Sequence, residues 1–132
     1  MSIQARLDVI GIVVADMAKA LAFYRAVGLS VPAAADTEPH VEVPVAGGLR
    51  LTFDTEEVIR SFYPDWTPVR GGRTNLAFVL PDAAGVDALH AELVAAGHES
   101  ALAPFDAFWG QRYAVVHDPD GNGVDLFAPL AS

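Results

Sequence analysis

Residues 113–127 read YAVVHDPDGNGVDLF, and the rest of the chain is organised around this stretch. Residues 113–117 show the two-residue alternation of a β-strand. Residues 118–121, DPDG, are typical of a tight turn, because proline presets its own φ and glycine accepts a positive φ. Residues 124–127 then return as a second strand, so the stretch predicts a β-hairpin that holds Asp125 on one face of a sheet.

Composition places the chain among globular proteins. With 132 residues it suits one domain or two small fused modules, and 52% hydrophobic against 19% charged residues excludes a disordered chain. A net charge of -9, from 17 acidic and 8 basic residues, argues against nucleic acid as a partner. The absence of cysteine excludes disulfides, thiolate zinc sites and thiol catalysis. No signal segment or long apolar run is present, which predicts a cytoplasmic protein with no membrane partner.

The chain begins with a predicted strand and helix. Residues 7–14 are rich in β-branched side chains and predict a buried strand. Asp16 is a good N-cap for a helix from Met17 to about Val27, which Gly28 ends. Two further strands follow at 41–45 and 49–54, separated by a glycine turn; Pro44 indicates that the first of them is an edge or bulged strand.

The second half repeats this plan. Residues 75–80 predict a strand, Asp82 a cap, and residues 83–96 a helix ended by Gly97. Asp16 and Asp82 are 82 − 16 = 66 residues apart, and the same offset superposes the preceding strands. At the far end of each half LRLTF matches VDLF, which pairs Arg50 with Asp125. The sequence therefore predicts an internal duplication, with residues 55–73 as a connector that contains a short helix.

The run at 7–29, the duplicated unit and the DPDGNGVDLF hairpin resemble the vicinal oxygen chelate superfamily, which includes glyoxalase I, bleomycin-resistance proteins and extradiol dioxygenases. The resemblance covers nearly the whole chain. It implies an α+β fold in which two tandem βαβββ modules form a curled mixed sheet around a cleft, often completed as a homodimer. Residues 1–132 would be a single domain, with module one at about 5–54, the connector at 55–73 and module two at about 74–129.

The resemblance also assigns four metal positions, which in this chain are Val9, Arg50, Asn75 and Asp125. Metal enzymes of the family would carry His or Gln at the first-strand positions and Glu or His at the last-strand positions. Val9 has no donor atom and Arg50 brings a permanent positive charge. These residues predict no metal and no other cofactor, and they predict that Arg50 and Asp125 form an ion pair across the cleft.

Other polar residues leave alternatives open. His40 with Glu38 and Glu42 would be a rebuilt metal site, although a solvated edge strand is the simpler interpretation. Asp54 with Asp125 would be a carboxylate pair for acid–base chemistry. Of the other histidines, we expect His90 in the core, His98 exposed and His117 bonded to the backbone of the turn. No Ser-His-Asp pattern is legible, and no catalytic residue is predicted.

Aromatic residues gather in two stretches that lack clean periodicity and therefore predict loops or short turns: Phe62, Tyr63 and Trp66 in the connector, and Phe105, Phe108 and Trp109 before the last hairpin. They either cover the open ends of the sheets or wall a cleft for an aromatic or cationic ligand. In the second interpretation Asn75, Gln111 and Arg112 would orient the ligand.

Two classes of function follow. The first is a metal-free protein that binds or sequesters a small molecule, such as an aromatic or cationic antibiotic, similar to the bleomycin-resistance branch. The alternative is a lyase, isomerase or dioxygenase of the same superfamily with an altered metal site. For the first class the expected ligand-binding residues are Arg50, Phe62, Trp66, Asn75, Phe108, Trp109, Gln111 and Asp125.

Overall fold

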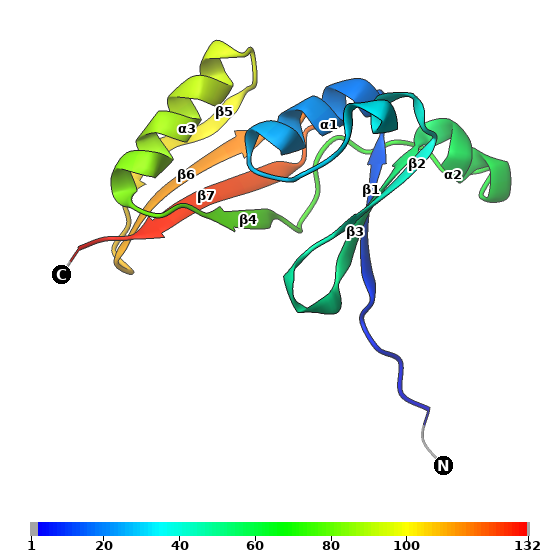
Figure 1. Ribbon diagram of the computed structural model, residues 1–132, viewed down its shortest axis with the longest axis horizontal. Coiled ribbons are helices and arrows are strands. Elements are labelled where there is room, and N and C mark those ends of the chain that lie inside the picture. Colours follow the sequence, from blue (N-terminus) through cyan, green and yellow to red (C-terminus); the bar gives the residue numbers. More distant parts are fainter. Residues whose placement is uncertain (1–2, 132) are drawn as a thin grey trace. The chain divides into compact units, whose positions relative to one another are not determined.

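The computed structural model describes residues 3–131, which form two compact units (Figure 1). Unit 1 contains the residues up to Leu21 together with Leu29–Pro68. Unit 2 contains Ala22–Gly28 and the residues from Val69 onward. Within residues 3–131, no helix is both long and apolar enough to cross a membrane.

Unit 1 is built on a three-stranded mixed sheet in the order β1-β3-β2. β1 pairs with β3 in parallel and β2 pairs with β3 antiparallel. The strands are β1 (Val9–Val14), β2 (His40–Pro44) and β3 (Arg50–Thr55), and the helices are η1 (Ala33–Thr37), η2 (Ala46–Gly48) and α2 (Glu56–Phe62). Helix α1 (Met17–Ala26) begins in unit 1, and its residues from Ala22 onward belong to unit 2. The predicted strands, the first helix and the connector helix are confirmed, and β2 is an edge strand as Pro44 indicated.

Side-chain alternation gives this sheet one apolar and one polar face. Val41, Val43, Leu51 and Phe53 are buried, while the residues between them on the edge strand β2 are exposed. The helices are capped as their sequences require, since the Asp16 carboxylate accepts the Lys19 backbone N–H at 3.0 Å. The polar face of β2 and β3 is therefore free to carry charged side chains.

Unit 2 is a complete βαβββ module with the sheet order β4-β7-β6-β5. Its elements are β4 (Leu76–Val79), α3 (Ala83–Ala95), β5 (Ser100–Asp106), β6 (Gln111–His117) and β7 (Gly123–Pro129). β4 runs parallel to β7, and the other two pairings are antiparallel. Figure 1 shows α3 lying along one face of this sheet. The α+β fold and the predicted hairpin are confirmed.

Two details differ from the sequence prediction. Phe105 lies in β5, a strand that the sequence did not predict, rather than in a loop. The register of β5 against β6 shifts between Ser100 and Leu102 and again before Phe105, and these irregularities remove the alternation that marks a strand. In unit 1 the described residues form the three strands that the residue pattern predicted. The fourth strand of the βαβββ module, which only the resemblance implied, is replaced by η1 at residues 33–37 after Pro32.

The carboxylate of Asp118 organises the turn of the hairpin. Asp118 is only 2% exposed and accepts four hydrogen bonds. Its donors are the backbone N–H groups of Asp120 and Asn122, both at 2.9 Å, the Asn122 side-chain amide at 2.8 Å and the Tyr24 hydroxyl at 2.6 Å. The prediction that His117 bonds the turn was wrong, because its ring lies against the Glu99 carboxylate.

Gly121 in the same turn cannot be replaced without strain. Its φ is +85°, and a Cβ atom there would lie 2.4 Å from Cγ of Arg70. The start of unit 2's second segment therefore packs directly on the turn, and the Arg70 guanidinium donates to the Pro119 carbonyl at 3.4 Å.

Candidate functional site

The face of the unit 2 sheet opposite α3 carries a nearly buried carboxylate. On β7, Val124 and Leu126 are fully buried on the face that α3 covers. Asp125 lies between them and points to the other face, where it is 9% exposed. Asp125, which the hairpin pattern predicted to lie on one face of a sheet, is therefore the carboxylate found on this face.

Two neutral donors hold the Asp125 carboxylate. The Asn75 side-chain amide donates to Oδ1 at 2.9 Å, and the Tyr113 hydroxyl donates to Oδ2. Burial, followed by the hydrogen bond and the negative charge of Asp125, raises the pKa of Tyr113 to about 12. The phenol consequently keeps its proton at neutral pH and acts as a donor. Sequence reasoning found Asn75 and Asp125 but missed Tyr113.

Tyr113 is also the centre of an aromatic cluster. Its ring lies 5.3 Å from Trp109, 6.4 Å from Phe105 and 6.3 Å from Phe127, with which it is stacked. The Trp109 indole N–H donates to the Gln111 carbonyl oxygen at 2.8 Å, so the amide fixes the plane of the indole. We name Phe105, Trp109, Tyr113 and Phe127 the aromatic cluster of unit 2.

Phe108 stands at the edge of this cluster. Its ring packs edge-on against Trp109 with 5.0 Å between centroids, yet its side chain is 97% exposed. Both residues lie in the turn between β5 and β6, as the sequence predicted. Unit 2 thus brings together five of the predicted binding residues: Asn75, Phe108, Trp109, Gln111 and Asp125.

The other three predicted binding residues lie in unit 1. Phe62 is exposed at the end of α2, and the Trp66 ring lies 5.5 Å below the Arg60 guanidinium. Arg50 lies at the start of β3, beside Val9 of β1. The ion pair of Arg50 with Asp125 stays a prediction, because each side chain has its recorded partners within its own unit.

The partners of Arg50 form a charged row on the polar face of the unit 1 sheet. Its guanidinium donates to Asp8 at 2.6 Å and to Glu42. His40 bridges the other oxygen of Glu42, at 3.0 Å, and Asp54 on the neighbouring strand, at 2.5 Å. Arg50 is therefore neutralised by two carboxylates.

The remaining histidines lie partly buried in unit 2. The His90 ring bonds the Ser100 hydroxyl at 2.7 Å, so its polar atom is satisfied as predicted, although the side chain is half-buried rather than in the core. His98 was expected to be exposed, but it is half-buried with its ring 4.9 Å from Phe23. Among the described residues, the rings of His90 and His98 have no contact with Asp125 or with the aromatic cluster.

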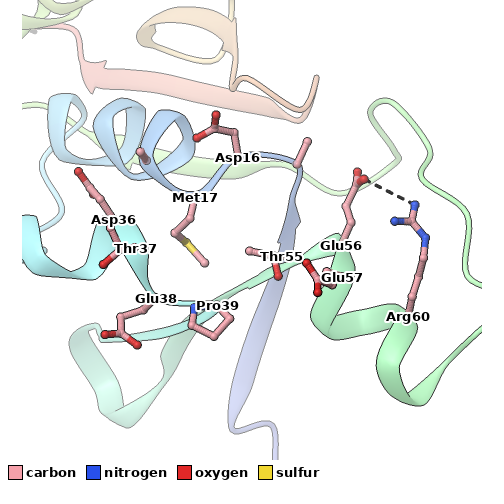
Figure 2. Close-up of a pocket in the computed structure, with 12 residues that line it drawn as sticks. Asp16, Met17, Asp36, Thr37, Glu38, Pro39, Thr55, Glu56, Glu57 and Arg60 are labelled. Atoms are coloured by element: carbon pink, nitrogen blue, oxygen red, sulfur yellow. Dashed lines mark ion pairs between the residues drawn. The ribbon is translucent and has the colours of Figure 1, made fainter.

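Unit 1 contains a separate pocket of about 490 Å³ (Figure 2). It lies among the start of α1, the segment before β2 and the start of α2. Five carboxylates line it (Asp16, Asp36, Glu38, Glu56 and Glu57), and the one arginine, Arg60, is paired with Glu56 at 3.6 Å. Sequence reasoning missed this pocket. The parallel pairing that sets Val14 beside Thr55 explains why residues distant in sequence meet here.

Comparison with known proteins identifies the family. The sequence model of the Glyoxalase/Bleomycin resistance protein/Dioxygenase superfamily matches residues 6–126. The chain belongs to this superfamily. The glyoxalase superfamily is the group that the duplicated unit and the hairpin resembled, so that prediction is confirmed. Among proteins with curated descriptions, none matches the chain.

Solved structures share the glyoxalase-superfamily fold. A glyoxalase/bleomycin resistance protein/dioxygenase family enzyme from Burkholderia phytofirmans superposes with a TM-score of 0.79 at 23% identity, covering 96% of this chain and 100% of its own. A glyoxalase-related enzyme from Fulvimarina pelagi gives 0.78 at 20% identity, covering 95% and 88%. The hypothetical protein SA1046 from S. aureus gives 0.76 at 16%, covering 96% and 95%. Because these sequence identities are low, the similarity to the three structures shows a shared fold and nothing further.

The four residues predicted to occupy the superfamily's metal positions do not fit a divalent ion. Val9 has no donor, and the Arg50 guanidinium would repel a cation. Asn75 turns its N–H₂ group, rather than its oxygen, toward Asp125. Residues 3–131 contain no cluster of three His, Asp or Glu residues able to hold a metal. His40 cannot rebuild the site, because Asp54 and Glu42 bind opposite nitrogens of its ring and so cannot converge on one ion.

We therefore expect the purified glyoxalase-superfamily chain to contain far less than one equivalent of transition metal. The measurement is elemental analysis after purification without a chelating resin. Replacing Arg50 by glutamate and Val9 by histidine should raise the metal content, since this restores two donors. A stoichiometry near one Zn, Ni, Fe or Mn per unmodified chain would contradict the prediction.

Proposed function

We propose that this protein is a metal-free small-molecule binding protein, and that its ligand is a flat, neutral-to-cationic aromatic compound. The ligand would lie on the unit 2 sheet face, over the aromatic cluster and against Asp125. Sequestering such a compound, for example an antibiotic, is the role we infer. The proposal rests on one comparison within the structure, between the two buried aspartates of unit 2.

Asp118 and Asp125 are both buried, but their carboxylates accept different numbers of hydrogen bonds. A carboxylate has about four acceptor sites. Asp118 fills four with neutral donors, whereas Asp125 has two, from Asn75 and Tyr113. Within the described part of unit 2, neither is paired with a basic side chain; Arg112 pairs instead with Asp87 and Asp106. Within unit 2, Asp125 thus keeps acceptor capacity and an unneutralised charge. Either the predicted ion pair with Arg50 or an N–H group of a cationic ligand would satisfy both.

The aromatic cluster supplies the flat surface beside this charge. A cation over an indole face contributes about 0.5–2 kcal/mol, depending on how dry the contact is. Trp109 is 49% exposed, so its ring is accessible, and Gln111 holds it in one orientation. The protein's acidic charge would additionally concentrate cations near the site, an effect that weakens as salt increases.

Replacing Trp109 by alanine is expected to weaken ligand binding by up to about thirtyfold, since 1.4 kcal/mol corresponds to a factor of ten. The fold should change little, because the residue lies in a turn. The measurement is tryptophan fluorescence during titration with a panel of aromatic cations and peptide antibiotics, at low and high salt. Trp66→Ala in unit 1 tests whether the ligand also reaches the connector aromatics, as the sequence predicted.

Other outcomes of the same panel would redirect the proposal. Quenching by catechols or anionic thiol conjugates, with no response to cations, would favour the lyase, isomerase or dioxygenase alternative. Binding abolished by Glu38→Gln, but unaffected by Trp109→Ala, would place the cation in the acidic pocket of unit 1. A homodimer and a cytoplasmic location remain predictions; light scattering of the purified protein tests the first.

A further inference from the structure

Five charged side chains follow one another across the polar face of the unit 1 sheet. Their order is Asp54, His40, Glu42, Arg50 and Asp8, and each contacts the next. They come from two neighbouring strands and the segment before β1, because β2 pairs with β3 so that His40 lies opposite Asp54. We call this set the charged row. It alternates in sign throughout only when His40 is positive.

The geometry around His40 suits a ring that carries two protons. Nδ1 lies 2.5 Å from an Asp54 oxygen and Nε2 lies 3.0 Å from a Glu42 oxygen. A neutral imidazole has one N–H and one lone pair, so it can donate to only one of these carboxylates. The imidazolium donates to both. Neither carboxylate can donate in return while it is ionised.

We propose that His40 acts as a pH-sensitive link in the charged row, so that the β2 edge of unit 1 loosens when the imidazolium loses its proton. β2 is held on one side only, by β3. His40 is the first residue of β2, and its bridge to Asp54 joins the two strands beyond their backbone hydrogen bonds. In the neutral ring, one carboxylate would face a lone pair and that bridge or the Glu42 contact would be lost.

The surroundings of His40 support this assignment. The hydrogen bonds that the ring donates to Glu42 first and Asp54 second, together with the negative charges of these partners, raise the pKa of His40 above its ordinary value of 6.5. Arg50 is the nearest positive group in the row, and Glu42 stands between it and the ring. No other charged side chain among residues 3–131 bonds to the ring. The side chain is 46% exposed, so the effect of its charge is partly screened.

The direction of the pH dependence follows from the raised pKa. Stabilisation by His40 is fully present below the unfolded-state value of about 6.5 and is lost as the pH rises through the folded-state pKa. Stability should therefore fall on the alkaline side of neutrality. A group with a lowered pKa would give the opposite trend.

The test combines thermal unfolding with NMR. Between about pH 6 and about pH 9, the Tm of the unmodified protein should fall by roughly 3 °C more than that of His40→Gln. His117→Gln is the matched control, since that histidine also bonds one carboxylate, Glu99, but lies in unit 2.

NMR provides the second measurement. The chemical shifts of the His40 ring protons should titrate with a midpoint above the ordinary histidine range. Hydrogen-exchange protection factors of the β2 amides should fall in the same pH interval.

Two results would overturn the proposal. One is a His40 titration midpoint at or below 6.5 in the unmodified protein, which needs no variant to fold. The other is a pH profile of Tm that His40→Gln leaves unchanged while His117→Gln flattens it. Asp54→Asn and Glu42→Gln should each lower the His40 midpoint, because each removes one of the two negative partners.

Discussion

Replacing Asp118 by alanine is expected to lower the free energy of unfolding by about 3–5 kcal/mol, which is large for a single substitution. The change removes the acceptor of four hydrogen bonds. It leaves the hydroxyl of Tyr24, a side chain only 1% exposed, buried without that acceptor. Burial, followed by the charge of Asp118, raises the pKa of Tyr24 strongly, so the phenol donates across the working pH range. Denaturant unfolding provides the measurement.

Tyr24→Phe is the matched variant for this experiment. It removes one of the four donors and leaves the turn intact, so its cost should be about 1–2 kcal/mol. A double-mutant cycle of the two substitutions isolates the bond between the hydroxyl and the carboxylate. If Asp118→Ala cost no more than Tyr24→Phe, the carboxylate would not organise the turn in the way that we describe.

The second large effect concerns ligand binding at Asp125. Asp125→Asn should weaken binding of a cationic ligand by about 10–100-fold, because a hydrogen bond to a charged group contributes about 1.5–3 kcal/mol. The asparagine keeps the shape of the side chain and one oxygen acceptor for the Tyr113 hydroxyl. Calorimetric titration with the best cation from the fluorescence panel, at two salt concentrations, measures the loss.

Glu92→Gln separates the local effect from the general one. Glu92 is an exposed residue of α3, and its substitution removes the same charge from the protein. It should change affinity little, and only at low salt. Equal weakening by both variants would mean that overall acidity attracts the ligand and that Asp125 does not contact it.

The elements with strong local signals could be predicted from the sequence. Asp16 and Asp82 accept the backbone N–H groups that make them caps. The DPDG turn forms the expected hairpin, and Gly121 has the expected positive φ. β5 escaped prediction because its register shifts break the period of two on which the argument depends. Helix caps and the hairpin turn could thus be predicted from short sequence patterns, whereas a strand with broken alternation could not.

The site was predictable only to the extent that the duplication placed residues in equivalent positions. This reasoning found Asn75 and Asp125, which the structure joins by a hydrogen bond. Tyr113 reaches Asp125 from the neighbouring strand, and this required the β6–β7 register, in which Val115 lies opposite Asp125. The same holds for His40 and Asp54, which are opposite each other on β2 and β3. Sequence separation hides cross-strand neighbours until the pairing is known.

The bond between Tyr24 and Asp118 also has a consequence for protein synthesis. The two residues are 94 positions apart, and both belong to unit 2. At about 5–20 residues per second, a ribosome would make Tyr24 roughly 5–20 s before its acceptor. During that interval the apolar rings of Phe23 and Tyr24 lack their final packing, although unit 1 can already pair its strands. We expect a nascent chain stalled before the hairpin to present these two rings to chaperones, and to lose that affinity once the DPDG turn has emerged.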